Sequence, residues 1–344
     1  MKIAVIYGGI SPERNVSIAG GRAVIDALRA KGHEVVPIDP AFGADQERKA
    51  ETLTSNIESF ATQEELSQFT PRNIIDCFAS NLFDGVEFAF ILLHGKYGED
   101  GTVQSLLDLR GIPYTSSGFQ ASAIAMDKIT SKNIFLANHI TTPPWDVLTP
   151  ADADDETYLM QVKKILGKNI VVKPADLGST IGLTRIKDAT VEDIADAIRV
   201  AAKYSSNILA ERYIEGRELT VGILDAQTFP IIEIVPHEDF YDYKHKYSKG
   251  STNYICPAEI PEDIANFICN MAVDAYKALG CTNIARADFI LDHDGQPYCL
   301  EINTIPGFCS TSLVPMAAKQ LGIEFGDLCE TLIARALQKR KKVK

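Results

Sequence analysis

The sequence predicts an α/β protein with more than one domain, and three observations carry this prediction. At 344 residues the chain is too long for one compact core and fits two or three domains. A continuous apolar run at residues 3–7 (IAVIY) and a second segment at 87–93 (EFAFILL), apolar after Glu87, are typical of strands buried on both faces. Residues 285–291 and 297–303 predict a hairpin, because Asp294-Gly295 between them favours a type I′ turn.

Composition excludes several classes of protein. The net charge of −12 argues against nucleic acid as the main partner. The seven cysteines include no C-x-x-C pair, which indicates reduced thiols in a cytoplasmic protein. No apolar run approaches the roughly 18 residues of a membrane span, and the apolar N-terminus is too short for a signal peptide. We therefore expect a cytoplasmic location and no membrane partner.

The first strand leads into a glycine-rich loop, residues 8–14 (GGISPER), a helix expected over 17–30 and a second strand at 35–38. This βαβ opening would suit a nicotinamide-binding fold, but the fingerprint G-x-G-x-x-G is absent. Residues 40–80 are polar and weakly periodic, and they predict a surface segment with helices.

His94 follows the strand at 87–93, at the carboxyl end, where open α/β sheets bind ligands. A lone histidine there is more often structural. Glu99 and Asp100 could form an acid pair, but we favour a role in closing the loop and capping a helix over 102–109.

A glycine-rich turn at 175–182 (ADLGSTIG) joins predicted strands at 169–174, which carries Lys173, and 183–186. Its backbone N–H groups could cover phosphates. It is not a Walker A motif, since no Gly-Lys-Ser/Thr opens a helix, and many ordinary hairpin turns look similar. Further predicted elements are strands at 207–213, 217–224 and 230–235, and helices at 191–204, capped by Thr190, and at 261–279.

The C-terminal hairpin places unusual side chains opposite one another. Counting outward from the turn gives three predicted pairs: Leu291 with Tyr298, Asp288 with Glu301, and Arg286 with Asn303. The two carboxylates would have Cβ atoms about 5 Å apart, a repulsion of about 3 kcal/mol at an effective dielectric of about 20. Mg²⁺ between them would relieve it, because all the ligands offered are oxygens. The alternative is a solvated outer face.

Residues 240–258 (FYDYKHKYSKGSTNYICPA) interleave aromatic side chains with lysines. Such a pattern can bind single-stranded nucleic acid, but the acidic balance of the chain opposes that interpretation.

Motifs along nearly the whole chain, residues 40–80 excepted, resemble the D-alanine–D-alanine ligase family of the ATP-grasp superfamily. They are GGISPERNVS at 8–17, HGKYGEDGTVQ at 94–104, the turn at 175–182, NILAERYIEGRE at 207–218, YDYKHKY at 241–247, RADF at 286–289, LEINTIPGF at 300–308 and SLVPMAA at 312–318. The chain departs from the family pattern at Asn15, Thr180 and Cys309.

The resemblance implies an ATP-grasp fold with an N-terminal Rossmann-like pre-ATP-grasp domain. The three expected domains are 1–120, 121–214 (the small central ATP-grasp domain) and 215–344, with ATP between the last two. It also implies the reaction: ATP phosphorylates the carboxylate of one D-alanine, and the amine of a second D-alanine attacks the acyl-phosphate.

The resemblance further implies the site residues. The catalytic candidates are Glu13, Ser179, Tyr247, Arg286 and Gly307. The substrate-binding candidates are His94, Lys246, Ser312 and Leu313. The candidates for ATP are Lys128, Lys173, Gly178, Ser179, Glu211, Tyr213, Ile214 and Glu218. The metal candidates are Asp288, Glu301 and Asn303, for Mg²⁺ or Mn²⁺, usually two ions.

Within this set, Glu13 is expected at the ammonium group of the first D-alanine. Glu13, Ser179 and Tyr247 would form a hydrogen-bonded group that fastens a mobile loop over the site and excludes water.

Two alternatives remain open from the sequence. One is a different ATP-grasp carboxylate–amine or carboxylate–hydroxyl ligase, such as a D-alanine–D-lactate ligase. The other is a non-catalytic nucleotide-binding homologue, although such a protein need not keep paired charges at 286, 288, 301 and 303. The family expectation for assembly is a homodimer.

Overall fold

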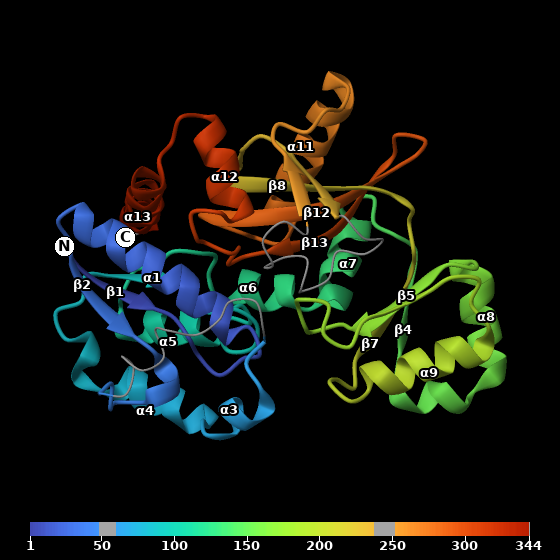
Figure 1. Ribbon diagram of the computed structural model, residues 1–344, viewed down its shortest axis with the longest axis horizontal. Helices are drawn as coiled ribbons and strands as arrows, with labels where there is room; N and C mark the ends of the chain where they lie inside the picture. The colour runs from blue at the N-terminus through green and yellow to red at the C-terminus, as the bar shows by residue number, and fades with distance from the viewer. Residues whose placement is uncertain (48–59, 237–251, 344) are drawn as a thin grey trace.

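The computed structural model describes residues 1–47, 60–236 and 252–343, which form three β-sheets with helices packed against them (Figure 1). The predicted α/β class is confirmed. The three sheets follow one another along the chain.

The first sheet has three parallel strands in the order β2-β1-β3. They are β1 (Lys2–Ile6), β2 (Glu34–Ile38) and β3 (Phe88–Ile91). Helix α1 (Arg14–Ala30) connects β1 to β2, and α5 (Thr102–Arg110) follows the loop after β3. All of β3, and β1 after its first residue, are buried, as the continuous apolar runs predicted.

The segment at 40–80 is not only a surface segment, so that part of the prediction is wrong. Its described elements are η1 (Pro40–Phe42), α3 (Gln63–Ser67) and α4 (Pro71–Ala79), and η2 (Asn81–Phe83) follows. Ile74, Cys77 and Phe78 of α4 are buried in the core beneath the first sheet. The spacing of these three residues puts them on one helix face, which the polar composition of the whole segment obscures.

The second sheet, with two helices against it, forms the small lobe, residues 145–212. Its antiparallel strands run in the order β4-β7-β5-β6. The elements are β4 (Trp145–Leu148), η3 (Pro150–Asp154), α8 (Glu156–Leu166), β5 (Ile170–Pro174), β6 (Thr184–Ile186), α9 (Val191–Ala201) and β7 (Ile208–Arg212). The predicted cap of α9 is confirmed, because Thr190 Oγ1 accepts a hydrogen bond from the Asp193 N–H at 3.1 Å.

The third sheet is the largest, with strand order β11-β10-β8-β12-β13 and β9 paired to β8. Its strands are β8 (Gly216–Leu224), β9 (Gln227–Thr228), β10 (Ile232–Pro236), β11 (Thr252–Ile255), β12 (Ile284–Asp292) and β13 (Pro297–Asn303). The helices around it are α6 (Phe119–Met126), α7 (Lys128–Ala137), α11 (Glu262–Ala278), α12 (Leu313–Gln320) and α13 (Phe325–Val343).

Two cores hold the large sheet in place. One contains residues of β1, β3 and α1 together with residues of β8, α12 and α13, so the first and third sheets share it. Figure 1 shows the consequence: α13, at the C-terminal end, lies beside α1 near the N-terminus. The other core joins α11 to α6 and α7 under the large sheet.

Helix α7 and most of α6 fall within the predicted central domain, 121–214, yet their buried apolar side chains belong to the core of the large sheet and not to the core of the small lobe. Phe135 of α7, for example, is fully buried in that second core. The domain boundaries stay predictions.

Within the described residues, none of the helices combines the length and the apolar character that crossing a membrane would need. All seven cysteines are free thiols, in agreement with the expectation from their spacing.

Candidate active site

Two adjoining cavities lie between the loops of the first sheet, the glycine-rich turn and the large sheet. The smaller has a volume of about 280 Å³ and the larger about 440 Å³. Lys128, Ser179, Asp288 and Glu301 line both. The cavities are therefore two compartments of one cleft, with these four side chains at the junction.

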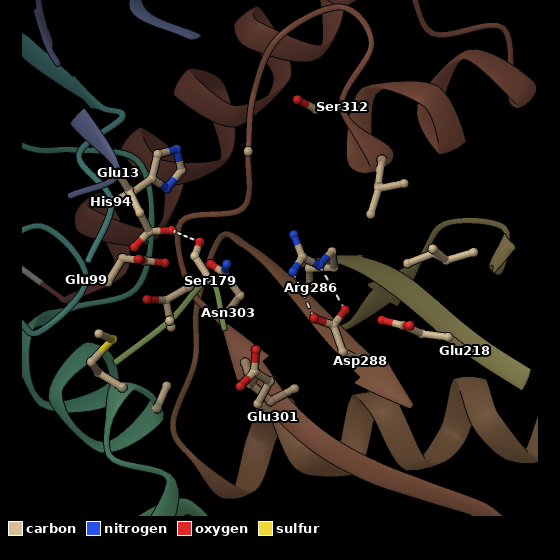
Figure 2. Close-up of a pocket in the computed structure, with 18 of the residues that line it drawn as sticks. Glu13, His94, Glu99, Ser179, Glu218, Arg286, Asp288, Glu301, Asn303 and Ser312 are labelled. Atoms are coloured by element: carbon tan, nitrogen blue, oxygen red, sulfur yellow. Dashed lines mark hydrogen bonds and ion pairs between the residues drawn. The ribbon is translucent and has the colours of Figure 1, made fainter. Parts of the chain in front are cut away.

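The hairpin β12–β13 supplies the floor of that junction. Arg286 lies opposite Asn303, and Asp288 lies opposite Glu301, as the sequence predicted. All four side chains line the smaller cavity, and Figure 2 shows them facing it.

The turn of this hairpin differs from the predicted type I′ turn. Leu291 pairs with Pro297, not with Tyr298, because the loop has three residues, 293–295, and of these only Gly295 has a positive φ, +81°. Asp292 stabilises the longer loop, since its Oδ1 accepts from the backbone N–H groups of residues 294 and 296. A bulge between positions 288 and 289, opposite Leu300, then restores the predicted register at the site.

Each of the opposed carboxylates has a positively charged partner within the protein. Arg286 Nε and Nη2 donate to the two oxygens of Asp288 at 2.9 and 2.8 Å, and Glu301 lies 3.1 Å from Lys128 Nζ. Protein cations thus relieve the like-charge repulsion in this structure, and the metal site stays a prediction.

The donors nevertheless fit a hard cation. Asp288, Glu301 and Asn303 offer carboxylate and amide oxygens at one wall of the cleft, and these are the ligands that Mg²⁺ prefers. No cluster of three or more His, Cys, Asp or Glu side chains with metal-binding geometry occurs in the described part of the chain.

Glu13 and Ser179 meet across the smaller cavity. The Ser179 hydroxyl donates a hydrogen bond to the Glu13 carboxylate (Figure 2). These are two members of the predicted hydrogen-bonded group. The third member, Tyr247, and the neighbouring Lys246 lie outside the described residues.

A buried ion pair fixes the loop that carries Glu13. The Arg14 guanidinium lies 2.5 Å from Asp39 Oδ2, and both side chains are almost fully buried. It also donates to the Gly9 carbonyl at 2.5 Å, and it lies over the rings of Phe42 and Phe69. The segment after residue 40 therefore supports the loop from behind.

His94 and Glu99 face the same cavity from the loop after β3 (Figure 2). Burial lowers the pKa of His94, against the opposing effect of Glu13, so the ring is held neutral. Glu99 Oε2 accepts from the Gly95 N–H at 2.6 Å, and Asp100 accepts from the N–H groups of residues 97 and 102. The predicted loop-closing and capping roles are therefore confirmed.

The remaining substrate-side candidates lie after β13. Gly307, Ser312 and Leu313 line the smaller cavity. Ser312 Oγ accepts from the Cys309 N–H at 3.0 Å and lies 3.0 Å from Cys309 Sγ. The side chain at the departure position 309 thus contacts the hydroxyl that was predicted to bind substrate.

Every candidate for ATP lines the larger cavity. These residues are Lys128, Lys173, Gly178, Ser179, Glu211, Tyr213, Ile214 and Glu218. Lys128 Nζ donates to the Leu177 carbonyl at 2.9 Å, beside the glycine-rich turn. Tyr213 forms part of the cavity wall, and the guanidinium of Arg185 lies over its ring, 3.7 Å from the centroid.

Comparison with known proteins decides the family. The model for the N-terminus of D-ala D-ala ligase matches residues 2–117, and the model for its C-terminus matches residues 134–334. The chain belongs to the D-alanine–D-alanine ligase family.

Relatives and solved structures agree with this assignment. The D-alanine–D-alanine ligase of Geobacter sulfurreducens is 40% identical over 341 residues, covering 99% of this chain and 95% of that protein. The one from Anaeromyxobacter is 41% identical over 338 residues, covering 98% and 97%. Two crystal structures of the ligase from Bacillus anthracis, one complexed with ATP, have TM-scores of 0.79 and 0.77. Their identities are 33% and 32%, and the match covers both chains almost completely.

Family membership confirms the resemblance and the ATP-grasp fold. The relatives described above are D-alanine–D-alanine ligases over nearly the full length of the chain, so the alternatives that the sequence left open are not favoured. All candidate residues of this ligase that the structure describes line the cleft, but the chemical role of each stays a prediction.

Sequence reasoning missed two residues of the ligase site. Glu99 lines the smaller cavity although only its loop contacts were predicted. Lys132 contacts Glu211 from behind the larger cavity. Its position four residues after Lys128, on the same face of one helix, was the available signal.

Proposed function

We propose that this enzyme joins two molecules of D-alanine into D-alanyl-D-alanine with ATP. The γ-phosphoryl group of ATP passes to a carboxylate oxygen of the first D-alanine, and ADP leaves. The amine of the second D-alanine attacks the carbonyl carbon of this acyl-phosphate, the C–N bond forms, the C–O bond to phosphate breaks, and the amine loses a proton. The dipeptide would serve peptidoglycan precursor synthesis, as in the family.

The observation that carries the proposal is the junction of the two cavities. A nucleotide in the larger cavity would have its phosphates near Lys128, Lys173 and the N–H groups after Gly178. A D-alanine in the smaller cavity would have its ammonium group near Glu13 and its carboxylate near Arg286. Positioning two anions against each other beside fixed cations is the main task in phosphoryl transfer.

Three groups suit the step after activation. Arg286 and the Gly307 N–H would stabilise the oxyanion of the tetrahedral intermediate. Ser312, Leu313 and Lys246 would hold the second D-alanine, and neutral His94 would face the carboxylate of the first. The contact between Ser179 and Glu13, with Tyr247, would exclude water, which otherwise hydrolyses the acyl-phosphate.

Asp288, Glu301 and Asn303 would hold Mg²⁺ or Mn²⁺, and bound metal would supply neutralising charge to the phosphates. We further infer a cytoplasmic homodimer that acts on small molecules, with no nucleic-acid or membrane partner.

The deciding experiment measures phosphate release from ATP with D-alanine, L-alanine and D-lactate, and identifies the products by mass spectrometry. We expect release with D-alanine and the dipeptide as the main product from equimolar D-alanine and D-lactate at neutral pH. A product that is mainly depsipeptide, or release that no amino acid stimulates, would contradict the proposal.

Glu301→Gln tests the metal site. We expect turnover to be lost, because a neutral amide cannot replace the carboxylate ligand, and the unfolding temperature to fall, because glutamine removes the ionic partner of the buried Lys128. Wild-type turnover that persists after complete removal of divalent cations would exclude the metal role.

A further inference from the structure

One buried carboxylate in the nucleotide cavity is shared by two lysines. Glu211 on β7 is 3% exposed, and its Oε1 lies 2.5 Å from Lys132 Nζ. Lys173 on β5 forms an ion pair with the other oxygen, Oε2. Lys132 is fully buried and also donates to Thr142 Oγ1 at 2.5 Å. The cluster has two positive charges and one negative charge.

The two lysines differ in their access to the cavity. Lys173 and Glu211 line it, whereas Lys132 does not. The Lys173 side chain is 14% exposed and that of Lys132 is 0% exposed. Lys173 can turn toward a ligand by changing its rotamer, while Lys132 is held behind Glu211 by Thr142.

A buried carboxylate without a positive partner is strongly unfavourable. If Glu211 had only Lys173, a phosphate group could take that lysine only by leaving the carboxylate unpaired. With Lys132 in place, Glu211 keeps one partner when Lys173 leaves. Burial raises the pKa of Glu211, but the two lysines outweigh it and hold the pKa at about 2. Burial lowers the pKa of Lys132, Glu211 opposes this and the charge of Lys173 adds to it, so moving Lys173 away favours the charged form of Lys132.

We propose that Lys132 is a positioning residue for the nucleotide, which compensates Glu211 so that Lys173 can turn from that carboxylate to a phosphate group. The inference rests on the proposed function, since it takes Lys173 as a phosphate ligand. Lys132 itself touches neither substrate nor reacting atoms.

The cluster also connects two parts of the fold. Lys132 is on α7, which packs on the core of the large sheet, whereas Glu211 and Lys173 belong to the small lobe. A purely structural role, in which the ion pair only ties these parts together, would lower stability without a specific effect on phosphate binding. The test must separate these roles.

The experiment is a double-mutant cycle on the full chain with Lys132→Met, Glu211→Gln and both together. Two measurements are made: the KM values for ATP and for D-alanine, and the Kd for inorganic tripolyphosphate, which carries no base. In the wild-type background we expect Lys132→Met to weaken tripolyphosphate binding and to raise the KM for ATP by about tenfold, with the KM for D-alanine unchanged. In the Glu211→Gln background, where no carboxylate retains Lys173, we expect less than about a twofold effect.

Glu211→Gln alone should bind tripolyphosphate more tightly than the wild type, because it releases Lys173. Lys132→Gln, which keeps a donor for Thr142, replaces Lys132→Met if the latter does not fold. Equal effects of the Lys132 change in both backgrounds, or a lowered unfolding temperature with unchanged tripolyphosphate binding, would overturn the inference. Failure of the wild type to bind either ATP or tripolyphosphate would instead refute the proposed function.

Discussion

Glu99 illustrates how burial sets the charge of one side chain in the site. Its carboxylate is 8% exposed and lies in a cavity wall with Glu13 and Arg286. Burial raises the pKa of Glu99 to about 8, the negative charges of Glu13 and Glu301 add to the rise, and the Gly95 N–H and Arg286 oppose it. At neutral pH Glu99 therefore holds a proton.

This shift predicts a pH-dependent effect of Glu99→Gln on stability. A carboxyl whose pKa is higher in the folded state keeps its proton in the folded state between its ordinary pKa and about 8, while the unfolded state loses it. The contribution of Glu99 to the free energy of unfolding of the wild type should therefore fall as the pH rises from about 5 to 8. Glutamine cannot ionise, so the variant should become progressively more stable relative to the wild type over that range.

Urea unfolding at several pH values measures this difference. The same replacement at the exposed Glu64 controls for the loss of one surface carboxylate. A stability difference between Glu99→Gln and wild type that does not change with pH would mean that Glu99 ionises normally in the folded protein.

At the residue scale the sequence predicted which side chains surround the cleft, and the family resemblance predicted the contact between Ser179 and Glu13, but the ion-pair partners were not predicted. The motifs identified Asp288 and Glu301, yet their partners, Arg286 and Lys128, come from one strand and one distant helix. Arg14 and Asp39, likewise, are 25 positions apart in the sequence, and no local pattern predicts that they pair. Partner choice depends on tertiary packing, which periodicity does not report.

Turns show the corresponding limit at the scale of elements. Asp294-Gly295 predicted a type I′ turn, but the loop there has three residues. Between β8 and β9, where no glycine is present, Asp225 and Ala226 both have positive φ, +47° and +64°, in a two-residue loop. The pairing of β8 within a large sheet outweighs the local preference at that turn. The predicted register at Asp288 was correct because the extra loop residue and the bulge compensate each other.

The glycine-rich turn, residues 176–183, yields the prediction at this scale. Ser179 and Thr180 have positive φ, +52° and +60°, so two residues with side chains hold a conformation that favours glycine. The turn lines both cavities, and Ser179 links it to Glu13. We expect its amides to exchange hydrogen slowly with a non-hydrolysable ATP analogue and faster without it, because phosphates would accept from the N–H groups.

Hydrogen exchange with mass spectrometry tests this expectation. The turn at Asp225-Ala226 is the matched control, since it also has two positive φ angles but lines neither cavity. Equal protection of residues 176–183 in both states would mean that the turn is only a structural connection.

At the scale of the whole molecule, the arrangement of the hydrophobic cores was harder to predict from the sequence than the existence of the sheets. Residues of α12 and α13 pack with β1 and α1, which are about 300 positions earlier in the chain, and the Lys31–Asp327 ion pair and the hydrogen bond between His33 and Glu330 border this contact. The motifs implied three domains along the chain, and the boundaries of these domains stay predictions. The motifs could not show that the first and last sheets would share one core, because this depends on which amphipathic helices pack together in the tertiary structure.

The shared core predicts that the small lobe opens separately from the rest. Its core consists of residues between Leu148 and Ala210 alone, whereas the first and third sheets are joined by common apolar contacts. Regions that share a core open together, and a region with its own core can open at lower free energy.

Native-state hydrogen exchange at increasing, low urea concentrations measures these opening free energies. Amides of β5 and β7 should show a smaller opening free energy than amides of β1 and β12, which should exchange as one unit. An ATP analogue, which would contact the small lobe and the large sheet at once, should raise the value for β5 and β7 by about 2.7 kcal/mol at 100 times its Kd. If all four strands have the same opening free energy, both with and without the analogue, the three sheets unfold as one cooperative unit.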